Sequence, residues 1–385
     1  MRLSSQPVTV DPPPLVVQPP EFDTDPPPLP LVASGDLPPQ LVTFDRVMRS
    51  YMQKYKITAG ELAVMKDGRL VLNRGYGWLN AAHTEAVHPE TPMRFASVVK
   101  PITRAAVRKL VADGKTIDGQ PLTLQTKAFV ALGVKPLNLP GHKMDSRLKD
   151  ITVQHLFDHK GGWDSMQAPL FDPMFQTPLI SKAAEHYPAG ADDIIRFMAG
   201  QPLQHDPGAK EVYSNFGHCV LGRIVEKASG KKYIHYVRED LLGPLLGATS
   251  FEAGRSLPSD RNPREPAYVS LEPPVPNVVN PALPPGPACD GGFHLEAMDS
   301  HGGLIATAAD LVRFASRFYF DGSTYMNRPP GCAAHYGSLP GTSSLLRWCK
   351  DGILFAAVFN LRHAEKSDEV DGLLQKAADS VGEWP

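Results

Sequence analysis

The chain has 385 residues, enough for one large domain or two of ordinary size. Hydrophobic residues make up 42% and the formal net charge is −2, so the composition is that of a globular protein and gives no reason to expect binding to nucleic acid or an anionic membrane surface. No apolar run approaches the roughly 20 residues that span a bilayer, and the N-terminus lacks the apolar core of a signal peptide, so we expect a soluble protein and assign no compartment.

Proline dominates the first 40 residues, as in DPPPLVVQPP and DPPPLPLV. This composition predicts an extended arm over residues 1–40, followed by a single domain over residues 41–385. A helix is expected at about residues 41–55. Two β-type runs joined by Lys-Asp-Gly follow within residues 61–80, a pattern typical of a hairpin.

The segment FASVVKPITRAAVRKLV, residues 95–111, predicts a helix that begins at or just before Ser97. Apolar residues recur there at helical spacing, and Pro101 is tolerated only in the first turn, where backbone N–H groups have no helical partner. Lys100 then lies one turn from Ser97 on the same face. A buried amine can lose its proton and accept the proton of the serine, although a capping serine and a surface lysine explain the same pattern.

The Ser-x-x-Lys spacing also occurs twice elsewhere, at Ser146/Lys149 and at Ser229/Lys232. Ser146 lies in a polar stretch without an apolar face. Ser229 lies in ASGKK, which is typical of a helix end terminated by glycine. Only Ser97 opens an amphipathic helix, so we expect the other two pairs to be accidental.

The middle of the chain predicts a mostly helical subdomain over about residues 120–250. A proline-rich loop is expected at about residues 252–290, and a loop of that length usually lines a site. The remaining elements are helices expected at 153–160, 191–200, 216–230, 232–246, 307–320 (capped by Thr307) and 367–384, and a second hairpin within 343–362.

The four cysteines are too few and too scattered for a disulfide scaffold, and none forms a Cys-x-x-Cys pair. We therefore expect no zinc site, and nothing in the sequence calls for another metal or a cofactor. A disulfide between Cys332 and Cys349 is conceivable because these residues flank the second hairpin.

Hairpins near both ends of the chain and helices between them predict an α/β (α+β) fold. One antiparallel sheet would be built from both chain ends and flanked by helices, with the mostly helical subdomain beside it. This layout resembles the serine β-lactamase and penicillin-binding-protein superfamily, from about residue 45 to residue 365. The class C β-lactamase type, which also contains esterases and D-amino-acid peptidases, is the branch that it resembles.

Five segments carry the resemblance. TPMRFASVVKPITRAAVRKLVADGK is similar to the family's nucleophile region, and DSRLKDITVQHLFDHKGGW looks like the segment that leads into the helical subdomain. YSNFGHCVLGRIVEKASGKKY looks like the Tyr-x-Asn region, and HGGLIATAADLVRF is similar to the Gly-Gly-Leu helix start. HYGSLPGTSSLL looks like the third motif, with histidine where β-lactamases have Lys-Thr-Gly.

The resemblance implies that Ser97, Lys100, Tyr213 and His335 form the catalytic set. Ser97 would form an acyl-enzyme, Lys100 or Tyr213 would accept its proton, and Tyr213 would also pass a proton to the leaving group. The N–H groups of Ser97 and Ser338 would form the oxyanion hole.

Three further residues enter the expected substrate site. Gly337 would let the backbone approach the substrate. Asn215 would bind Lys100 or a substrate amide, unless it is only a turn residue. Trp163 would line the pocket, unless it belongs to the core. Similar short motifs occur at Tyr325/Asn327, in a polar linker, at His301, in a turn-like sequence, and at His159. Their order and context make us expect that none of them takes part.

His335 would be a weaker, pH-dependent partner for an anion than the family's lysine, and its presence resembles the esterase and peptidase branches more than the dedicated β-lactamases. We therefore expect a serine hydrolase, a carboxylesterase with room for weak β-lactam hydrolysis, acting on a small-molecule ester, amide or β-lactam. A D-amino-acid peptidase, an amidase or an acyltransferase is the alternative enzyme, and a non-catalytic scaffold the alternative of another class. The linker at 319–334 is short for the family, which leaves open whether an edge strand is missing.

Overall fold

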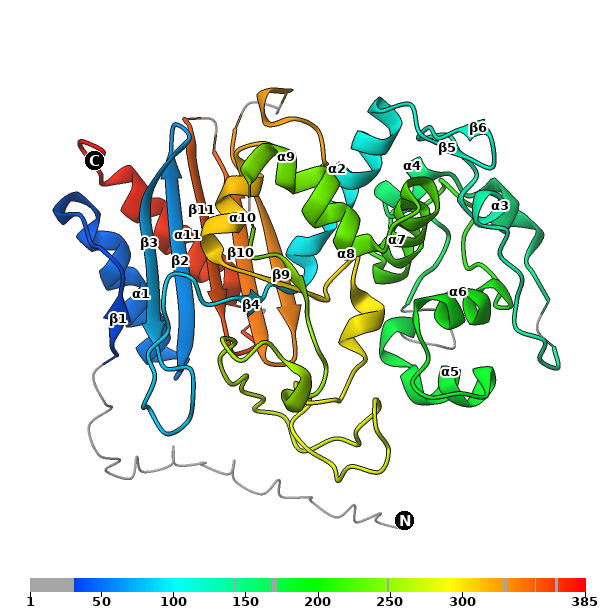
Figure 1. Cartoon of the computed structure of the whole chain (residues 1–385), viewed down its shortest axis with the longest axis horizontal. Helices are drawn as coiled ribbons and strands as arrows, with labels where there is room; N and C mark the ends of the chain where they lie inside the picture. The colour runs from blue at the N-terminus through cyan, green and yellow to red at the C-terminus, as the bar shows by residue number, and fades with distance from the viewer. Residues whose placement is uncertain are drawn as a thin grey trace, which may run out of the picture. The chain divides into compact units, whose positions relative to one another are not determined.

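The computed structural model describes residues 31–385 except 142, 166, 168–171, 248, 328–330, 350 and 364–365. Its centre is a six-stranded antiparallel sheet in the order β1-β3-β2-β11-β10-β9 (Figure 1). Both ends of the chain contribute to it, which confirms the predicted sheet. The strands are β1 (Ala33–Ser34), β2 (Ala59–Lys66), β3 (Arg69–Gly77), β9 (Ala333–Leu339), β10 (Thr342–Trp348) and β11 (Ile353–Phe359).

The strand nearest the N-terminus, β1, comes from the stretch in which we expected an extended arm. It pairs with β3 through Ala33 and Ser34. Within residues 31–40, Ala33 and Ser34 are therefore part of the sheet. The rest of the expected arm, residues 1–30, lies outside the described residues.

The β2–β3 hairpin forms where the Lys-Asp-Gly sequence predicted it. Asp67 and Gly68 both have positive φ, 49° and 81°, which is the backbone of the turn that matches the twist of two antiparallel strands. Side chains of β2 alternate between the two faces of the sheet. Leu62 and Val64 face one hydrophobic cluster, while Ala63 and Met65 face the other.

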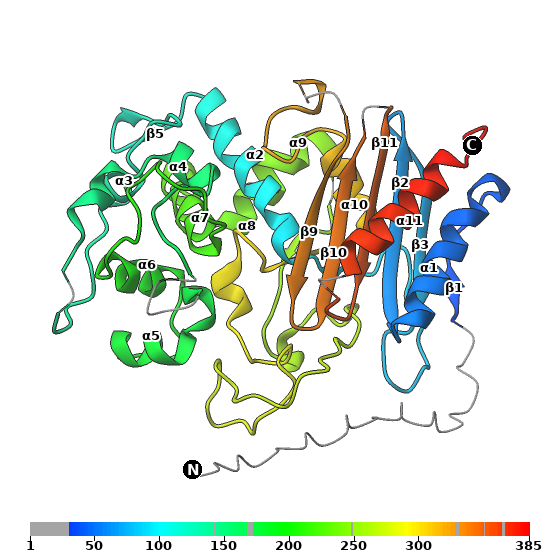
Figure 2. The ribbon, with the colours of Figure 1, turned by 180° about the vertical axis from the view of Figure 1, so that it is seen from behind.

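Helices cover both faces of the sheet. The predicted terminal helices α1 (Val42–Lys54) and α11 (Ser367–Asp379) pack side by side on one face, which Figure 2 shows from the front. On the opposite face α10 (Ala308–Ala315) packs against β2 and β11. Thr307 caps α10 as predicted, because its side chain accepts a hydrogen bond from the N–H of Asp310. This helix ends earlier than the expected residue 320.

The helical part of the chain is built around α7 (Asn215–Ser229), which contacts the helix that follows Ser97, α2 (Val99–Ala112). Gly230 ends α7 in the left-handed conformation, as predicted. The remaining helices are α3 (Ala128–Leu132), α4 (Val153–Phe157), α5 (Thr177–Ala184), α6 (Ala191–Ala199), α8 (Tyr233–Tyr236) and α9 (Gly243–Leu246).

Two details of the helical part differ from the prediction. The sequence analysis did not identify α3 and α5, which are short. The single helix expected at 232–246 is broken into α8, a π-helical stretch at Val237–Leu242 and α9. Gly243 and Pro244 follow the π-helical stretch, and Pro244 cannot donate the next backbone hydrogen bond.

Short strands form two further small sheets. β4 (Met93–Arg94), β8 (Leu304–Ala306) and β7 (Glu252–Ala253) form a three-stranded sheet, and β5 (Thr116–Ile117) pairs with β6 (Gln120–Pro121). The third-motif sequence forms the edge strand β9, and the described residues of the short linker before Ala333 add no further strand to the sheet. Cys332 and Cys349 form a disulfide that joins the start of β9 to the end of β10.

Candidate active site

Ser97 lies in a tight turn between β4 and α2. The residue before it, Ala96, has a φ of 46°, a conformation that a residue with a side chain rarely adopts. Residues 96–98 form a 3₁₀ turn that leads directly into α2, and Pro101 occupies the first turn of that helix, as predicted. Ser97 therefore sits at the start of the helical segment, where its backbone N–H has no helical partner by position.

Lys100 lies behind Ser97 and is fully buried. Its Nζ donates to Ser97 Oγ at 3.0 Å and to the backbone carbonyl of His301 at 3.0 Å. Burial lowers the pKa of Lys100 to about 7, an effect that Asp172 opposes and Arg104 reinforces. A substantial fraction of this amine is thus neutral at neutral pH, which is the state a proton acceptor needs.

Tyr213 reaches Ser97 from the other side. It ends the loop before α7, and its Oη lies 2.7 Å from Ser97 Oγ. Its ring is about half exposed on the pocket wall and lies 4.8 Å from Lys100 Nζ. Desolvation of the hydroxyl raises the pKa of Tyr213 to about 12, so this group holds its proton at neutral pH.

The register of the β9–β10 hairpin determines where the Ser338 N–H points. The two-residue loop Pro340–Gly341 makes Leu339 and Thr342 a hydrogen-bonded pair, so the next pair, Ser338 and Ser343, is not hydrogen-bonded. The Ser338 N–H therefore points away from β10. Because β9 is the sheet edge, this N–H is directed to the side on which the Ser97 turn packs.

Gly337 allows β9 to lie close to that turn. A Cβ atom at this position would come within 2.3 Å of both the carbonyl oxygen of Phe95 and Ser344 Oγ. Ser344 Oγ donates to the same carbonyl at 2.7 Å. The glycine is thus required by close packing of the edge strand on the nucleophile segment.

His335 lies on the edge strand β9 and makes a contact that the sequence analysis did not predict. Its Nε2 lies 2.9 Å from the carbonyl oxygen of Ser97. Burial and the nearby Lys100 lower the pKa of His335 to about 3, so at neutral pH the ring is uncharged and donates to Ser97. The expected pH-dependent anion partner is therefore neutral and already engaged.

A pocket of about 600 Å³ opens above these groups. Most of the predicted site residues line it, namely Ser97, Tyr213, Asn215, His335, Gly337 and Ser338. Asn215 does not contact Lys100, because its side-chain amide donates to Asp172. Trp163 is 7% exposed and packs against Phe129 and Phe216, so it belongs to the core and borders only a small adjoining cavity.

The sequence analysis missed several residues that line the pocket, and three of the residues that it did not assign to the site bear on its chemistry. Asp172 and Arg362 line the pocket, and the carbonyl of His301 anchors Lys100. The sequence FDPMF does carry a local signal, since an aspartate before a proline is typical of a helix N-cap, and Asp172 caps a short turn there. That signal predicts a cap and says nothing of a pocket.

The alternative Ser-x-x-Lys pairs lack this environment. Lys149 and Lys232 are exposed, and Ser146 is exposed at the start of a short turn. Ser229 lies at the end of α7, where its side chain contacts backbone groups of the same helix end. Only Lys100 among the three lysines is buried.

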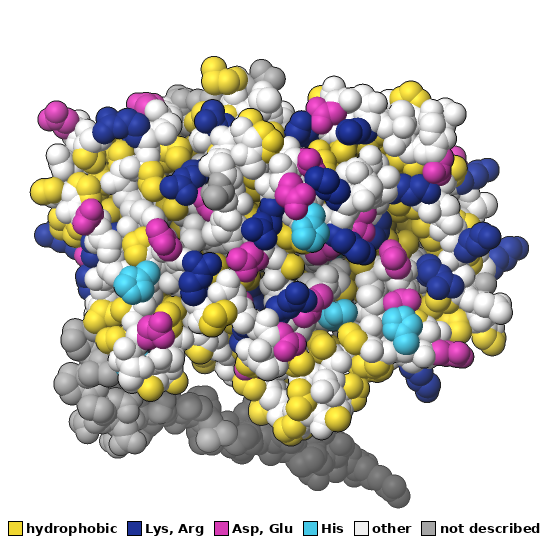
Figure 3. Space-filling model, viewed as in Figure 1, with side chains coloured by type: hydrophobic (Ala, Val, Ile, Leu, Met, Phe, Trp, Pro, Cys, Tyr) yellow, Lys and Arg dark blue, Asp and Glu magenta, His cyan; other side chains and the backbone are white. Residues whose placement is uncertain are grey.

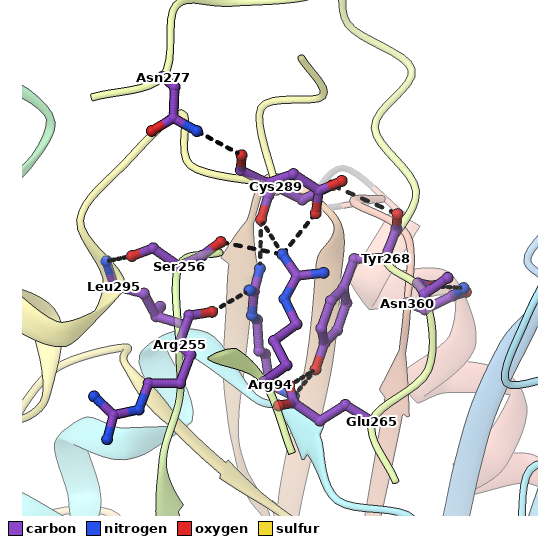
Figure 4. A network of polar contacts seen from close by, with 12 residues as sticks. Arg94, Arg255, Ser256, Glu265, Tyr268, Asn277, Cys289, Leu295 and Asn360 are labelled. Atoms are coloured by element: carbon purple, nitrogen blue, oxygen red, sulfur yellow. Dashed lines mark hydrogen bonds and ion pairs between the residues drawn. The ribbon is translucent and has the colours of Figure 1, made fainter. Parts of the chain in front are cut away.

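The proline-rich segment after β7 contacts the segment that leads to Ser97. Arg94, three residues before Ser97, is fully buried and donates to the carbonyls of Cys289 and Arg255 at 2.9 and 2.7 Å (Figure 4). The Arg94 guanidinium lies 4.2 Å from the ring centre of Tyr268. Residues 254–290 do not line the 600 Å³ pocket, contrary to our expectation, because they are held against Arg94 instead.

Three further observations concern metal ions, membranes and surface charge. Among the described residues, no three His, Cys, Asp or Glu side chains are grouped so as to hold a metal ion. The helices in the described ranges are all too short or too polar to cross a bilayer. On the face shown in Figure 3, acidic and basic side chains are intermingled.

Comparison with known proteins identifies the family. The β-lactamase family model matches residues 44–328. The chain belongs to the β-lactamase family. Protein flp of Staphylococcus aureus (strain COL) is 25% identical over 209 residues, which are 54% of this chain and 38% of that protein. N-acetylmuramyl-L-alanine amidase of Bacillus subtilis (strain 168) is 31% identical over 193 residues, 48% of this chain and 40% of the amidase.

The chain thus spans less than half of the length of these curated relatives. Among solved structures, the D-amino acid amidase of Ochrobactrum anthropi SV3 superposes with a TM-score of 0.63 at 17% identity, covering 89% of this chain and 98% of the amidase. That likeness shows the shared fold.

Proposed function

We propose that this protein is a serine hydrolase that forms an acyl-enzyme at Ser97 and acts on carboxylic esters. One observation carries the proposal: Ser97 Oγ lies within hydrogen-bond distance of both Lys100 Nζ and Tyr213 Oη. The lowered pKa of Lys100 supports this lysine as the proton acceptor, since Tyr213 holds its own proton more tightly than usual.

In the proposed reaction Ser97 Oγ attacks the carbonyl carbon and its proton passes to Lys100. The negative oxygen of the tetrahedral intermediate accepts hydrogen bonds from the N–H groups of Ser97 and Ser338. Tyr213 then protonates the departing alcohol and recovers a proton from Lys100. A water molecule attacks the acyl-enzyme by the same steps in reverse order and releases the acid.

The state of His335 supports esters over β-lactams. A neutral ring that donates to the Ser97 carbonyl offers no positive charge to the carboxylate of a β-lactam. Amide hydrolysis is the second candidate, favoured by the carboxylate of Asp172 in the pocket wall. An acyltransferase would use the same acyl-enzyme. The contacts among Ser97, Lys100 and Tyr213 argue against a non-catalytic scaffold.

Active-site labelling tests the proposal. A fluorophosphonate probe should modify Ser97 alone, and short-chain p-nitrophenyl esters should be turned over. Ser97→Ala should abolish both, whereas the matched controls Ser146→Ala and Ser229→Ala should remain within a few-fold of wild type. Labelling that persists in Ser97→Ala, or a loss of about 100-fold in a folded control variant, would show that the nucleophile lies elsewhere.

A further inference from the structure

The wall of the active-site pocket contains one carboxylate that the proposed reaction does not use. Asp172 lies between the helical part and the pocket, where it is partly buried. Its Oδ1 accepts from the N–H of Met174 at 3.0 Å, and its Oδ2 accepts from the side-chain amide of Asn215. Both partners are neutral donors, so this carboxylate is hydrogen-bonded but is not paired with a cation.

Ion pairing within the protein does not satisfy Asp172. In the described part of the chain, no Lys, Arg or His nitrogen lies within 4.0 Å of its carboxylate, whereas the other pocket-wall charge, Arg362, pairs with Glu272 at 3.4 Å. Desolvation raises the pKa of Asp172, and the hydrogen bonds from Asn215 and Met174 and the charge of Lys100 oppose this shift. A carboxylate that faces a pocket without a protein cation is suited to a cation brought by the ligand.

The position of Asp172 indicates which half of the substrate carries that cation. Asp172 borders both the main pocket and the small, less open cavity beside Trp163 and Phe216, while Arg362 is about half exposed. The acyl group stays bound after the leaving group has departed, so it suits the more enclosed side. An ammonium group close to the reacting carbonyl would then lie near Asp172.

We propose that Asp172 forms an ammonium-binding subsite for the acyl half of the substrate, so that the enzyme prefers aminoacyl amides and esters with a free amine over their N-acylated forms. This inference rests on the proposed acyl-enzyme at Ser97 and narrows its substrate class. The ammonium donates to the Asp172 carboxylate while the carbonyl occupies the oxyanion hole.

Paired substrates test the subsite. Phenylalanine p-nitroanilide, as either enantiomer, is compared with its N-acetyl derivative near pH 7, where the free α-amine is mostly protonated. Wild type should favour the free amine at least tenfold in kcat/KM for one enantiomer. In Asp172→Asn that ratio should fall to about one. Asp113→Asn removes the same charge at the C-terminal end of α2, outside the pocket, and should keep the wild-type ratio.

Inhibition provides a second measurement that needs no variant. 2-Phenylethylamine should inhibit p-nitrophenyl acetate hydrolysis by wild type at a concentration at least tenfold below that required for 2-phenylethanol. Equal inhibition by the two compounds, equal turnover of the free and acetylated anilides, or an Asp172→Asn enzyme that keeps the preference overturns the subsite. Absence of ester turnover and of labelling at Ser97 would instead overturn the proposed function.

Discussion

Lys100 is a lysine whose surroundings change the chemistry of its amine. It lies on the first turn of an amphipathic helix, yet its Nζ is enclosed between Ser97 and the carbonyl of His301. Water is therefore replaced by two hydrogen-bond acceptors that do not carry a full negative charge. Burial without a direct counter-ion is the reason why its pKa falls from the usual 10.5 to about 7.

A pH profile tests the role of Lys100. A base acts in its unprotonated form, so kcat/KM for an ester should rise with pH and reach half its plateau near pH 7. Arginine stays protonated at any usable pH, so Lys100→Arg should lower kcat/KM by roughly 10²–10⁴-fold and remove that rise. Near-normal activity in folded Lys100→Arg would assign the lysine a purely electrostatic role.

A double-mutant cycle tests whether Lys100 and Tyr213 act together. Both side chains contact the same oxygen, and Lys100 Nζ lies 4.8 Å from the Tyr213 ring. If they form one proton-transfer unit, Lys100→Arg and Tyr213→Phe should each cost about as much kcat as the double variant. Circular dichroism checks folding. Losses that multiply would mean that the two groups work independently.

At the scale of elements, the distance between β9 and the Ser97 turn sets the geometry of the proposed oxyanion hole. Gly337→Ala would force a methyl group against the Phe95 carbonyl and Ser344 Oγ, so β9 must move outward and carry the Ser338 N–H with it. Loss of one such donor typically costs about 10²–10³-fold in rate. We expect that loss in kcat, with a smaller effect on KM.

The control for this substitution is Gly372→Ala on α11. A Cβ atom there meets nothing within 4 Å, and alanine stabilises a helix interior by about 1 kcal/mol relative to glycine. This variant should keep full activity and unfold at an equal or higher temperature. Comparable kcat values for Gly337→Ala and wild type would contradict the importance of close packing by β9.

At the scale of the whole molecule, the sequence predicts the arrangement of residues that are close together in the chain. Ser97, Lys100 and Pro101 lie in one helical segment, so their relative positions follow from helix geometry. Asp172 and Arg362 enter the pocket from segments 190 residues apart, and no local pattern could bring them together. His335 has strand-like neighbours that predict β9, but its bond to Ser97 depends on how the sheet edge packs against α2.

The long segment between β7 and α10 illustrates the same limit. Its prolines predict a loop, and a loop forms. Its position depends on Arg94, whose buried guanidinium is satisfied by carbonyls 161 and 195 residues further along the chain. The nucleophile segment and the proline-rich segment are therefore stabilised by one set of contacts.

Because Arg94 joins these two segments, a substitution of Arg94 tests whether the proline-rich segment supports the candidate active site. Arg94→Met keeps the length of the side chain but leaves the carbonyl of Arg255 without its donor, and Cys289 keeps only the donor from Arg261. Leaving the carbonyl of Arg255 unpaired should lower the free energy of unfolding by about 1–3 kcal/mol. Residues 255–290 should become more sensitive to limited proteolysis, and kcat should fall because Ala96 needs support in its unfavourable conformation.

Arg255→Met, which removes an exposed side chain and keeps its carbonyl, is the matched control and should resemble wild type. If Arg94→Met unfolds and is cleaved as wild type is, the proline-rich segment is held by other contacts and the nucleophile turn does not depend on it.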